Sequence, residues 1–208
     1  MSNSPISIPL RFQRAELEAK ADLEPEGRAL LAEIGHPEQL VQAMIDGGNA
    51  RDAIHSLALI LPHRHAVWWG CMAARILPNI DARRTDLAAL VAAERWVQTG
   101  SAADAEAAGE AAEAANRDLA PSWVATAAFW SGRSIAPRGL QPVPPAPHLA
   151  GVATRIALKL LATDPALQGR IAFADFLPLG MALLVGGNGA EAQAALRDRV
   201  AQLPPPAQ

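Results

Sequence analysis

The residues best suited to chemistry lie in one short stretch, Pro62 to Cys71, which holds His63, His65 and the only cysteine of the chain. On a helix, two residues separated by one position project about 200° apart, so both histidines cannot bind one metal ion. Cys71 is expected on a buried face, where an apolar environment raises the pKa of a thiol and makes it a poor nucleophile. We therefore expect no metal, no cofactor and no catalytic residue in this stretch.

A second interpretation of the same stretch is a surface that binds a partner protein. Its candidate residues are His63, Arg64, His65 and Trp69, which are bulky, form hydrogen bonds and include types enriched in binding hot spots. Adjacent residues on a helix point about 100° apart, so we expect Trp68 in the core and Trp69 at the rim or against a partner helix. In the alternative interpretation, both indoles fill core space that the many alanines leave open.

The composition excludes several classes of protein. Hydrophobic residues make up 50% of the 208 residues, but 46 residues are alanine and aromatic residues reach only 4%. Such a chain favours closely packed helices over a β-sandwich. The net charge is −3 and no basic patch is present, so nucleic acid is not an expected partner. A single cysteine excludes an internal disulfide framework.

Localisation is predicted from the apolar stretches. The N-terminal residues lack the basic and apolar regions of a signal peptide. The most apolar window, Ile171 to Val185, contains Asp175 and Pro178 and is shorter than the roughly 20 apolar residues that a bilayer crossing needs. We therefore expect a cytoplasmic protein without membrane insertion. A helix over 166–177 is predicted to overlap the start of this window and to be broken by Pro178.

Helix signals recur along the whole chain, and no alternating strand pattern interrupts them. Pro25, Pro37 and Pro62 each stand where the first turn of a helix is expected. Asn49 is predicted to cap a helix over 50–61, whose apolar residues recur at helical spacing. No repeat period indicates a solenoid. The prediction is an all-α protein, built as an irregular multi-helix bundle or an array of helical hairpins.

One predicted hairpin joins a helix of small residues to a helix with large ones. The helix over 102–116 has no apolar residue larger than alanine, and Ser101 with Asp104 resembles a capping box at its start. The next helix carries Trp123 and Trp130 on one stripe. We expect the alanine face to pack against these two indoles in an antiparallel arrangement.

The opposite face of the 102–116 helix carries an acidic stripe. Glu106, Glu110 and Glu113 follow helical spacing, which is typical of a solvated face. Together with Asp104, the stripe also allows a second interpretation, because inhibitors of nucleases often present an acidic face. An immunity-type protein that binds and blocks a toxin is therefore an open alternative.

The segment 132–147 contains five prolines, which forbid a helix and favour an extended chain. It is either a linker between an N-terminal bundle (1–131) and C-terminal helices (148–208), or a strap across the surface. We expect the strap, because the C-terminal helices alone would build only a small core. The chain, 1–208, is therefore predicted to be a single helical domain.

Two parts of the chain resemble a family of uncharacterised bacterial all-helical proteins. The resemblance lies in the run 63–71 and in the run 92–97 leading to the tryptophan-containing runs 122–123 and 129–132. It covers about residues 50–135 and implies a helical fold without any catalytic residue to carry over. The resemblance also implies an association with type VI secretion, because members of this family occur near type VI secretion genes.

The expected function is non-enzymatic. The chain is predicted to be an adaptor, chaperone or accessory factor of a secretion system, possessing a helical surface that binds another protein. Its partner would then be a secretion component or, in the immunity alternative, a toxin. An enzyme whose site the sequence does not reveal is the remaining alternative.

Overall fold

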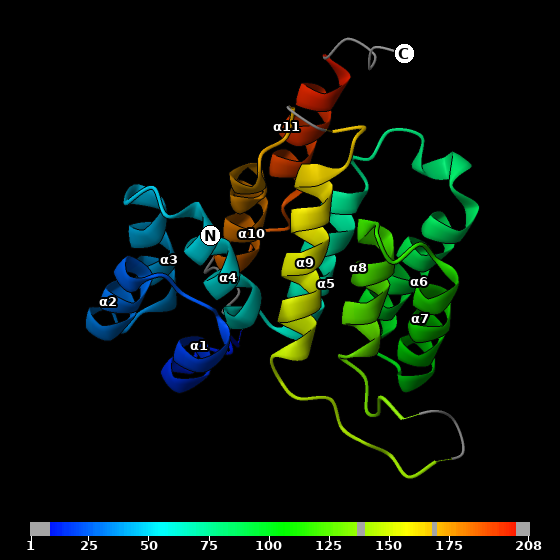
Figure 1. Ribbon diagram of the computed structural model, residues 1–208, viewed down its shortest axis with the longest axis horizontal. Coiled ribbons are helices and arrows are strands. Elements are labelled where there is room, and N and C mark those ends of the chain that lie inside the picture. The colour runs from blue at the N-terminus through cyan, green and yellow to red at the C-terminus, as the bar shows by residue number, and fades with distance from the viewer. Residues whose placement is uncertain (1–8, 137–139, 168–169, 203–208) are drawn as a thin grey trace, which may run out of the picture.

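The structure is a computed structural model that describes residues 9–136, 140–167 and 170–202 (Figure 1). Over these residues it contains 11 packed α-helices, two short 3₁₀ helices and no strand. The predicted all-α fold class is therefore confirmed.

The helices are short, and none in the described part of the chain is long and apolar enough to cross a membrane. The longest, α6, has 16 residues. In chain order the α-helices are α1 (Arg14–Lys20), α2 (Pro25–Glu33), α3 (Pro37–Asp46), α4 (Ala50–Ile60), α5 (His63–Ala74), α6 (Arg84–Thr99), α7 (Ala102–Ala114), α8 (Ala120–Phe129), α9 (Leu149–Thr163), α10 (Leu177–Leu184) and α11 (Ala190–Ala201).

Local signals for helix starts act as expected. Pro25 lies in the first turn of α2. A backbone N–H at this position would have no acceptor within the helix, so the N–H that proline lacks costs no hydrogen bond. The side chain of Asn49 caps α4 by accepting a hydrogen bond from the backbone N–H of Asp52 at 3.1 Å. Ser101 caps α7 in the same way, through the backbone N–H of Asp104 at 3.0 Å.

Two sequence predictions of helices are wrong or incomplete. The described residues 166–167 and 170–176 form no α-helix where one was predicted over 166–177. Instead, a 3₁₀ helix spans Phe173–Phe176, and Pro178 lies in the first turn of α10. Proline is compatible with a helix start as well as with a helix end, so it begins a helix here and breaks none. Helix α1 had not been predicted, because its seven residues bury only Leu17 and show little periodicity.

A buried carboxylate joins α2 to α4. Asp52 is wholly buried, and its Oδ2 accepts hydrogen bonds from the backbone N–H of Glu24 at 2.9 Å and from Nδ2 of Asn49 at 3.0 Å. Nη1 of Arg51 donates to the other oxygen at 3.0 Å. A Cβ on Gly27 would lie 2.0 Å from the Asp52 carboxylate, so this glycine leaves room for it. Paired in this way, a buried charge is tolerated.

Helix α9 lies in the middle of the bundle, where it packs against α4, α5 and α8 (Figure 1). Helices α6, α7 and α8 form a group in which each packs against the other two. Helix α10 packs on α4 and α5, and α3 packs on α4. The helix that follows the proline-rich segment therefore packs against helices that precede it.

Small residues let these helices approach closely. A Cβ on Gly151 of α9 would lie 2.3 Å from the carbonyl oxygen of Ala58 in α4, a distance that no real side chain tolerates. A Cβ on Gly70 of α5 would lie 3.2 Å from Cγ2 of Val124 in α8. Backbones at such short separation make many dispersion contacts although few large side chains are present.

Helices α7 and α8 form the predicted antiparallel hairpin. Near the middle of α7, a Cβ on Gly109 would lie 2.8 Å from the ring of Phe129. Near the start of α7, a Cβ on Gly132 would lie 2.8 Å from Cβ of Ala105. The ring that covers the small-residue face is that of Phe129, and the indoles predicted for this place lie half-buried beside it. The prediction missed Phe129 because it considered only the stripe of the two tryptophans.

Substitution of Gly151 tests the close approach of α9 to α4. In an open helix, Gly→Ala favours folding by up to about 1 kcal/mol. At Gly151 the new Cβ meets the carbonyl oxygen of Ala58, so we expect Gly151→Ala to lower the free energy of unfolding by about 1–3 kcal/mol. Urea unfolding followed by circular dichroism measures this change.

Gly35→Ala is the matched control, because an added Cβ there has no neighbour within 4 Å. It should change the free energy of unfolding by less than about 0.5 kcal/mol. A Gly151→Ala protein as stable as the control would contradict the close approach.

Candidate functional site

The start of α5, which the sequence predicts to bind a partner, is tied to two other elements. The Arg64 guanidinium donates hydrogen bonds to the carbonyl oxygens of Val97 and Gln98, at the end of α6, at 2.9 Å each. Nε2 of His63 donates to the carbonyl oxygen of Pro147 at 2.9 Å, just before α9. These side chains thus have structural roles, and partner binding by them stays a prediction.

The two histidines of this stretch share a depressed pKa. Burial lowers the pKa of His63, and the positive charge of Arg11 adds to the effect. Burial and the neighbouring Arg64 likewise lower the pKa of His65 below its ordinary value. Their surroundings therefore favour the neutral form of both imidazoles. The two side chains are two positions apart on α5 and lie on different faces of it.

Trp69 is wholly buried and Trp68 is half-buried, so the expected position of Trp69 at the rim is wrong, whereas the alternative interpretation, in which the indole fills core space, is confirmed for Trp69. The indole Nε1–H of Trp69 donates to the carbonyl oxygen of Phe176 at 3.0 Å. A Cβ on Gly180 of α10 would lie 2.8 Å from the Trp69 ring, so α10 covers this face of α5. Spacing within α5 could not show that a helix so distant in sequence packs there.

Cys71 is wholly buried, as the sequence predicts. Burial, together with the nearby carboxylate of Glu94, raises its pKa well above the ordinary value for a thiol. Glu94 itself accepts two hydrogen bonds from Arg75, at 2.7 and 2.6 Å. No group of three or more metal-ligating side chains occurs among the described residues.

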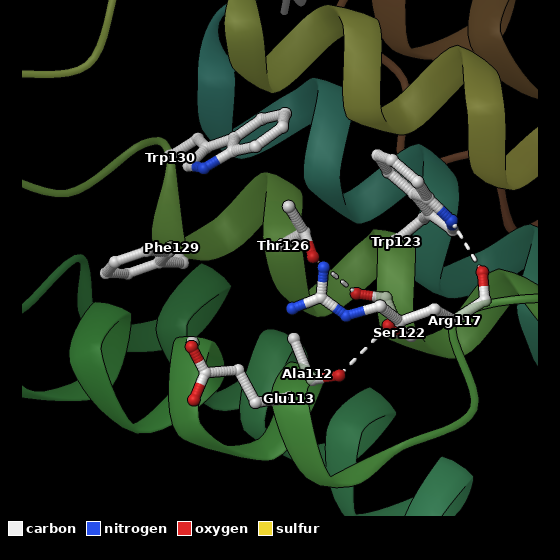
Figure 2. A pocket seen from close by; sticks show the side chains of 9 residues that line it. Ala112, Glu113, Arg117, Ser122, Trp123, Thr126, Phe129 and Trp130 are labelled. Carbon is white, nitrogen blue, oxygen red and sulfur yellow. Dashed lines mark hydrogen bonds between the residues drawn. The ribbon is translucent and has the colours of Figure 1, made fainter. Parts of the chain in front are cut away.

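A surface hollow lies between α7 and α8 and is lined by aromatic rings (Figure 2). Its volume is about 120 Å³. The indoles of Trp123 and Trp130 meet edge to face, with ring centroids 6.4 Å apart and planes at 77°. The lining residues are Gly109, Ala112, Glu113, Arg117, Ser122, Trp123, Thr126, Phe129 and Trp130.

Hydrogen bonds to the backbone fix several walls of this hollow. Nε1–H of Trp123 donates to the carbonyl oxygen of Arg117 at 2.9 Å, which sets the orientation of the indole (Figure 2). The Ser122 hydroxyl donates to the carbonyl oxygen of Ala112 at 3.0 Å, and the Thr126 hydroxyl to that of Ser122 at 2.8 Å. The hydrogens of both hydroxyl groups are thereby used within the chain.

The side chains of Glu113 and Arg117 place one charge of each sign at the hollow. Both residues are exposed. In Figure 2 the Arg117 guanidinium extends toward Thr126, while the Glu113 carboxylate lies on the α7 side. An aromatic hollow with charged groups at its edge can bind an apolar anchor and orient it by polar contacts.

The hollow continues into a larger groove of about 460 Å³ between α7 and the segment that follows α8. Gly109, Glu113 and Phe129 line both. On the α7 side the groove is lined by carboxylates of the acidic stripe, two of which also interact within the chain, Glu106 and Glu110. The other side is mainly apolar, lined by Ser134, Ile135, Ala136, Leu140 and Pro142.

Asp104, the remaining acidic residue of this region, is part of a structural cluster. Its carboxylate accepts hydrogen bonds from the hydroxyls of Thr99 at 2.6 Å and Ser101 at 2.7 Å, and pairs with Arg95 at 2.8 Å. The hydrogen bonds from Thr99 and Ser101, and then the charge of Arg95, lower the pKa of Asp104. Asp104 thus joins the end of α6 to the start of α7.

Sequence reasoning identified the two indoles and the acidic stripe but not the hollow. It assigned Trp123 and Trp130 to packing and did not include Phe129 or Arg117. The hollow could have been predicted from a mismatch in size between the two helices. The rings of α8 are large, whereas the residues of α7 that face them, Gly109 and Ala112, are small. Rings too large for such a face must stay partly uncovered.

A family model matches residues 40–184, which are 145 of the 208 residues of the chain. This family is described as a family of unknown function, DUF6931. The chain belongs to DUF6931. No curated protein and no solved structure matches the sequence of this chain. The DUF6931 match runs from α3 to the end of α10, so it includes the hollow, the groove and the proline-rich segment.

Deletion of each adjacent indole tests the corrected orientation. Trp69→Ala removes a fully buried ring together with its hydrogen bond to Phe176, so we expect the free energy of unfolding to fall by about 3–5 kcal/mol. Trp68→Ala removes a half-buried ring and should lower the free energy of unfolding by clearly less than Trp69→Ala does. Urea unfolding measures both losses, and a larger loss for Trp68→Ala would show that the orientation is wrong.

Proposed function

We propose that this protein is a non-enzymatic interaction protein that binds another protein through the hollow and groove beside α7 and α8. The observation that carries the proposal is the cluster of partly exposed rings, Trp123, Phe129 and Trp130, next to the charged Glu113 and Arg117. Tryptophan and arginine are enriched among the residues that contribute most binding energy at protein interfaces. A rigid aromatic hollow also accepts an apolar side chain of a partner.

The rigidity of the hollow supports binding. Trp123 is held by its hydrogen bond to the Arg117 backbone and by the edge-to-face contact with Trp130. Gly109 and Ala112 also line the hollow, and neither has a rotatable side-chain bond that binding would have to order. A surface that loses little conformational entropy on binding gains affinity for the same contacts.

The non-enzymatic part of the proposal rests on the groups that the sequence marks as reactive. Cys71 lies in the core with a raised pKa, which favours the unreactive thiol over the thiolate. His63 donates its hydrogen bond to a backbone carbonyl of the same chain. Neither group lines the hollow.

We further propose that the protein acts in the cytoplasm as an adaptor, chaperone or accessory factor of a secretion system. The link to type VI secretion rests on the sequence resemblance alone. The immunity alternative, in which the acidic stripe binds a toxin, has less support than this proposal. The carboxylate of Asp104 already pairs with Arg95 and accepts a hydrogen bond from the hydroxyl of Ser101. We therefore favour the aromatic hollow as the binding surface.

A photo-cross-linking residue in place of Arg117, at the edge of the hollow, tests the proposal in the native host. The control carries the same residue in place of Glu38, which is exposed on α3. We expect an adduct at the Arg117 position that the Glu38 position does not give. Mass spectrometry then identifies the partner for measurements with purified proteins.

In those measurements, Trp130→Ala should weaken binding by at least about 10-fold, since it removes a central ring of the surface. Trp68→Ala is the matched control, because Trp68 is also half-buried but does not line the hollow. Isothermal titration calorimetry measures both affinities. No adduct at Arg117, or equal binding by the two variants, would show that the proposal is wrong.

A further inference from the structure

The connection between α8 and α9, residues 130–148, is much longer than these neighbouring helices need. Connections between packed helices usually have about 2–8 residues, and much longer ones without regular structure are commonly functional. In Figure 1 the described part that precedes α9, residues 140–148, extends away from the bundle, and the described residues of the connection contain no helix. Its length therefore calls for an explanation beyond joining two helices.

Hydrogen bonds close the base of this connection. The backbone N–H of Ile135 donates to the carbonyl oxygen of Val143 at 2.9 Å, and the N–H of Val143 donates to Oγ of Ser134 at 3.1 Å. Farther along, Nε2 of His63 donates a hydrogen bond to the carbonyl oxygen of Pro147 at 2.9 Å. The residues between these two anchor points are therefore fixed at both ends.

The sequence around these anchors favours one kind of backbone conformation. Every residue from 141 to 147 is either a proline or directly precedes one. Proline fixes its own φ near −65°, and it disfavours the helical region for the residue before it. The sequence therefore favours the polyproline II conformation, whose three residues per turn would place Pro142 and Pro145 on one edge of the segment.

Two large apolar side chains of this segment are exposed. Leu140 is 65% exposed and Val143 is 50% exposed, and they are two of the four exposed large hydrophobic residues among those described. Residues 140–144 and 146–147 are exposed as well. Exposed apolar side chains that are gathered on an anchored segment are typical of an interaction site.

We propose that residues 140–147, the proline segment, are a ligand for an aromatic-lined groove on the partner protein. This inference rests on the proposed function, because it specifies what kind of protein binds at the groove beside α7. Leu140 and Pro142 of the proline segment also line that groove. Proline rings pack against tryptophan and tyrosine side chains, whose N–H and O–H groups donate to the exposed carbonyl oxygens. A preformed segment loses little entropy on binding.

The chemistry of the proline segment selects this kind of partner. Residues 140–147 carry no charged side chain, so the segment has no group that would pair with a phosphate or with a charged protein surface. The contacts available to it are ring packing and hydrogen bonds to carbonyl oxygens. Binding should therefore depend little on salt concentration.

The first test places the photo-cross-linking residue at Val143 of the full chain in the native host. We expect an adduct with the partner, attached to a surface lined by aromatic residues. An adduct on a surface without aromatic residues would overturn the inference, and so would no adduct at all. If the Arg117 position gives an adduct and Val143 gives none, the proposed function stands and only this inference fails.

The second test measures the affinity of the purified partner for the full chain. Pro142→Ala combined with Pro145→Ala should weaken binding at least about 10-fold, because the polyproline II conformation would place both prolines on one edge of the segment. The control combines Pro9→Ala with Pro165→Ala, two exposed prolines outside the segment, and should bind like the native chain. A synthetic peptide with the sequence of residues 139–148 should compete with the native chain. Equal binding by the two double variants, or no competition by the peptide, would overturn the inference.

Discussion

The short distance between helix backbones is the constraint on which this structure depends. With 46 alanines in 208 residues, the chain has few large side chains to fill space between helices. Close packing is then reached by bringing the backbones together, as where Gly151 of α9 meets the carbonyl oxygen of Ala58. Because α9 also packs against α5 and α8, this one contact helps to set the position of the hairpin that carries the hollow.

The candidate site follows from the same constraint. Large rings pack on small residues in two places of the bundle, with different results. At Trp69 the ring is covered by α10, whose Gly180 allows direct contact, and the indole becomes part of the core. At Trp123 and Trp130 the rings extend beyond the small residues of α7 and remain half-exposed. An uncovered ring surface is what a partner protein can bind.

The sequence predicts what depends on neighbouring residues and misses what depends on distant ones. The cap at Asn49 was predicted because its hydrogen bond joins residues three positions apart. For Trp69 the sequence left burial and exposure open, because the acceptor of its hydrogen bond, Phe176, lies 107 residues away. Pro178 was misread because proline is compatible with either end of a helix. The hollow was missed since it depends on how far α7 and α8 are apart.

On this account the hollow is a preformed part of the closely packed bundle. Native-state hydrogen exchange tests this most directly, because it measures the free energy of opening for each backbone amide. In a preformed hollow, amides of α8 between Trp123 and Phe129 open with the same free energy as those of α9, equal to that of global unfolding. Opening of α8 at a clearly lower free energy, while α9 stays protected, would contradict it.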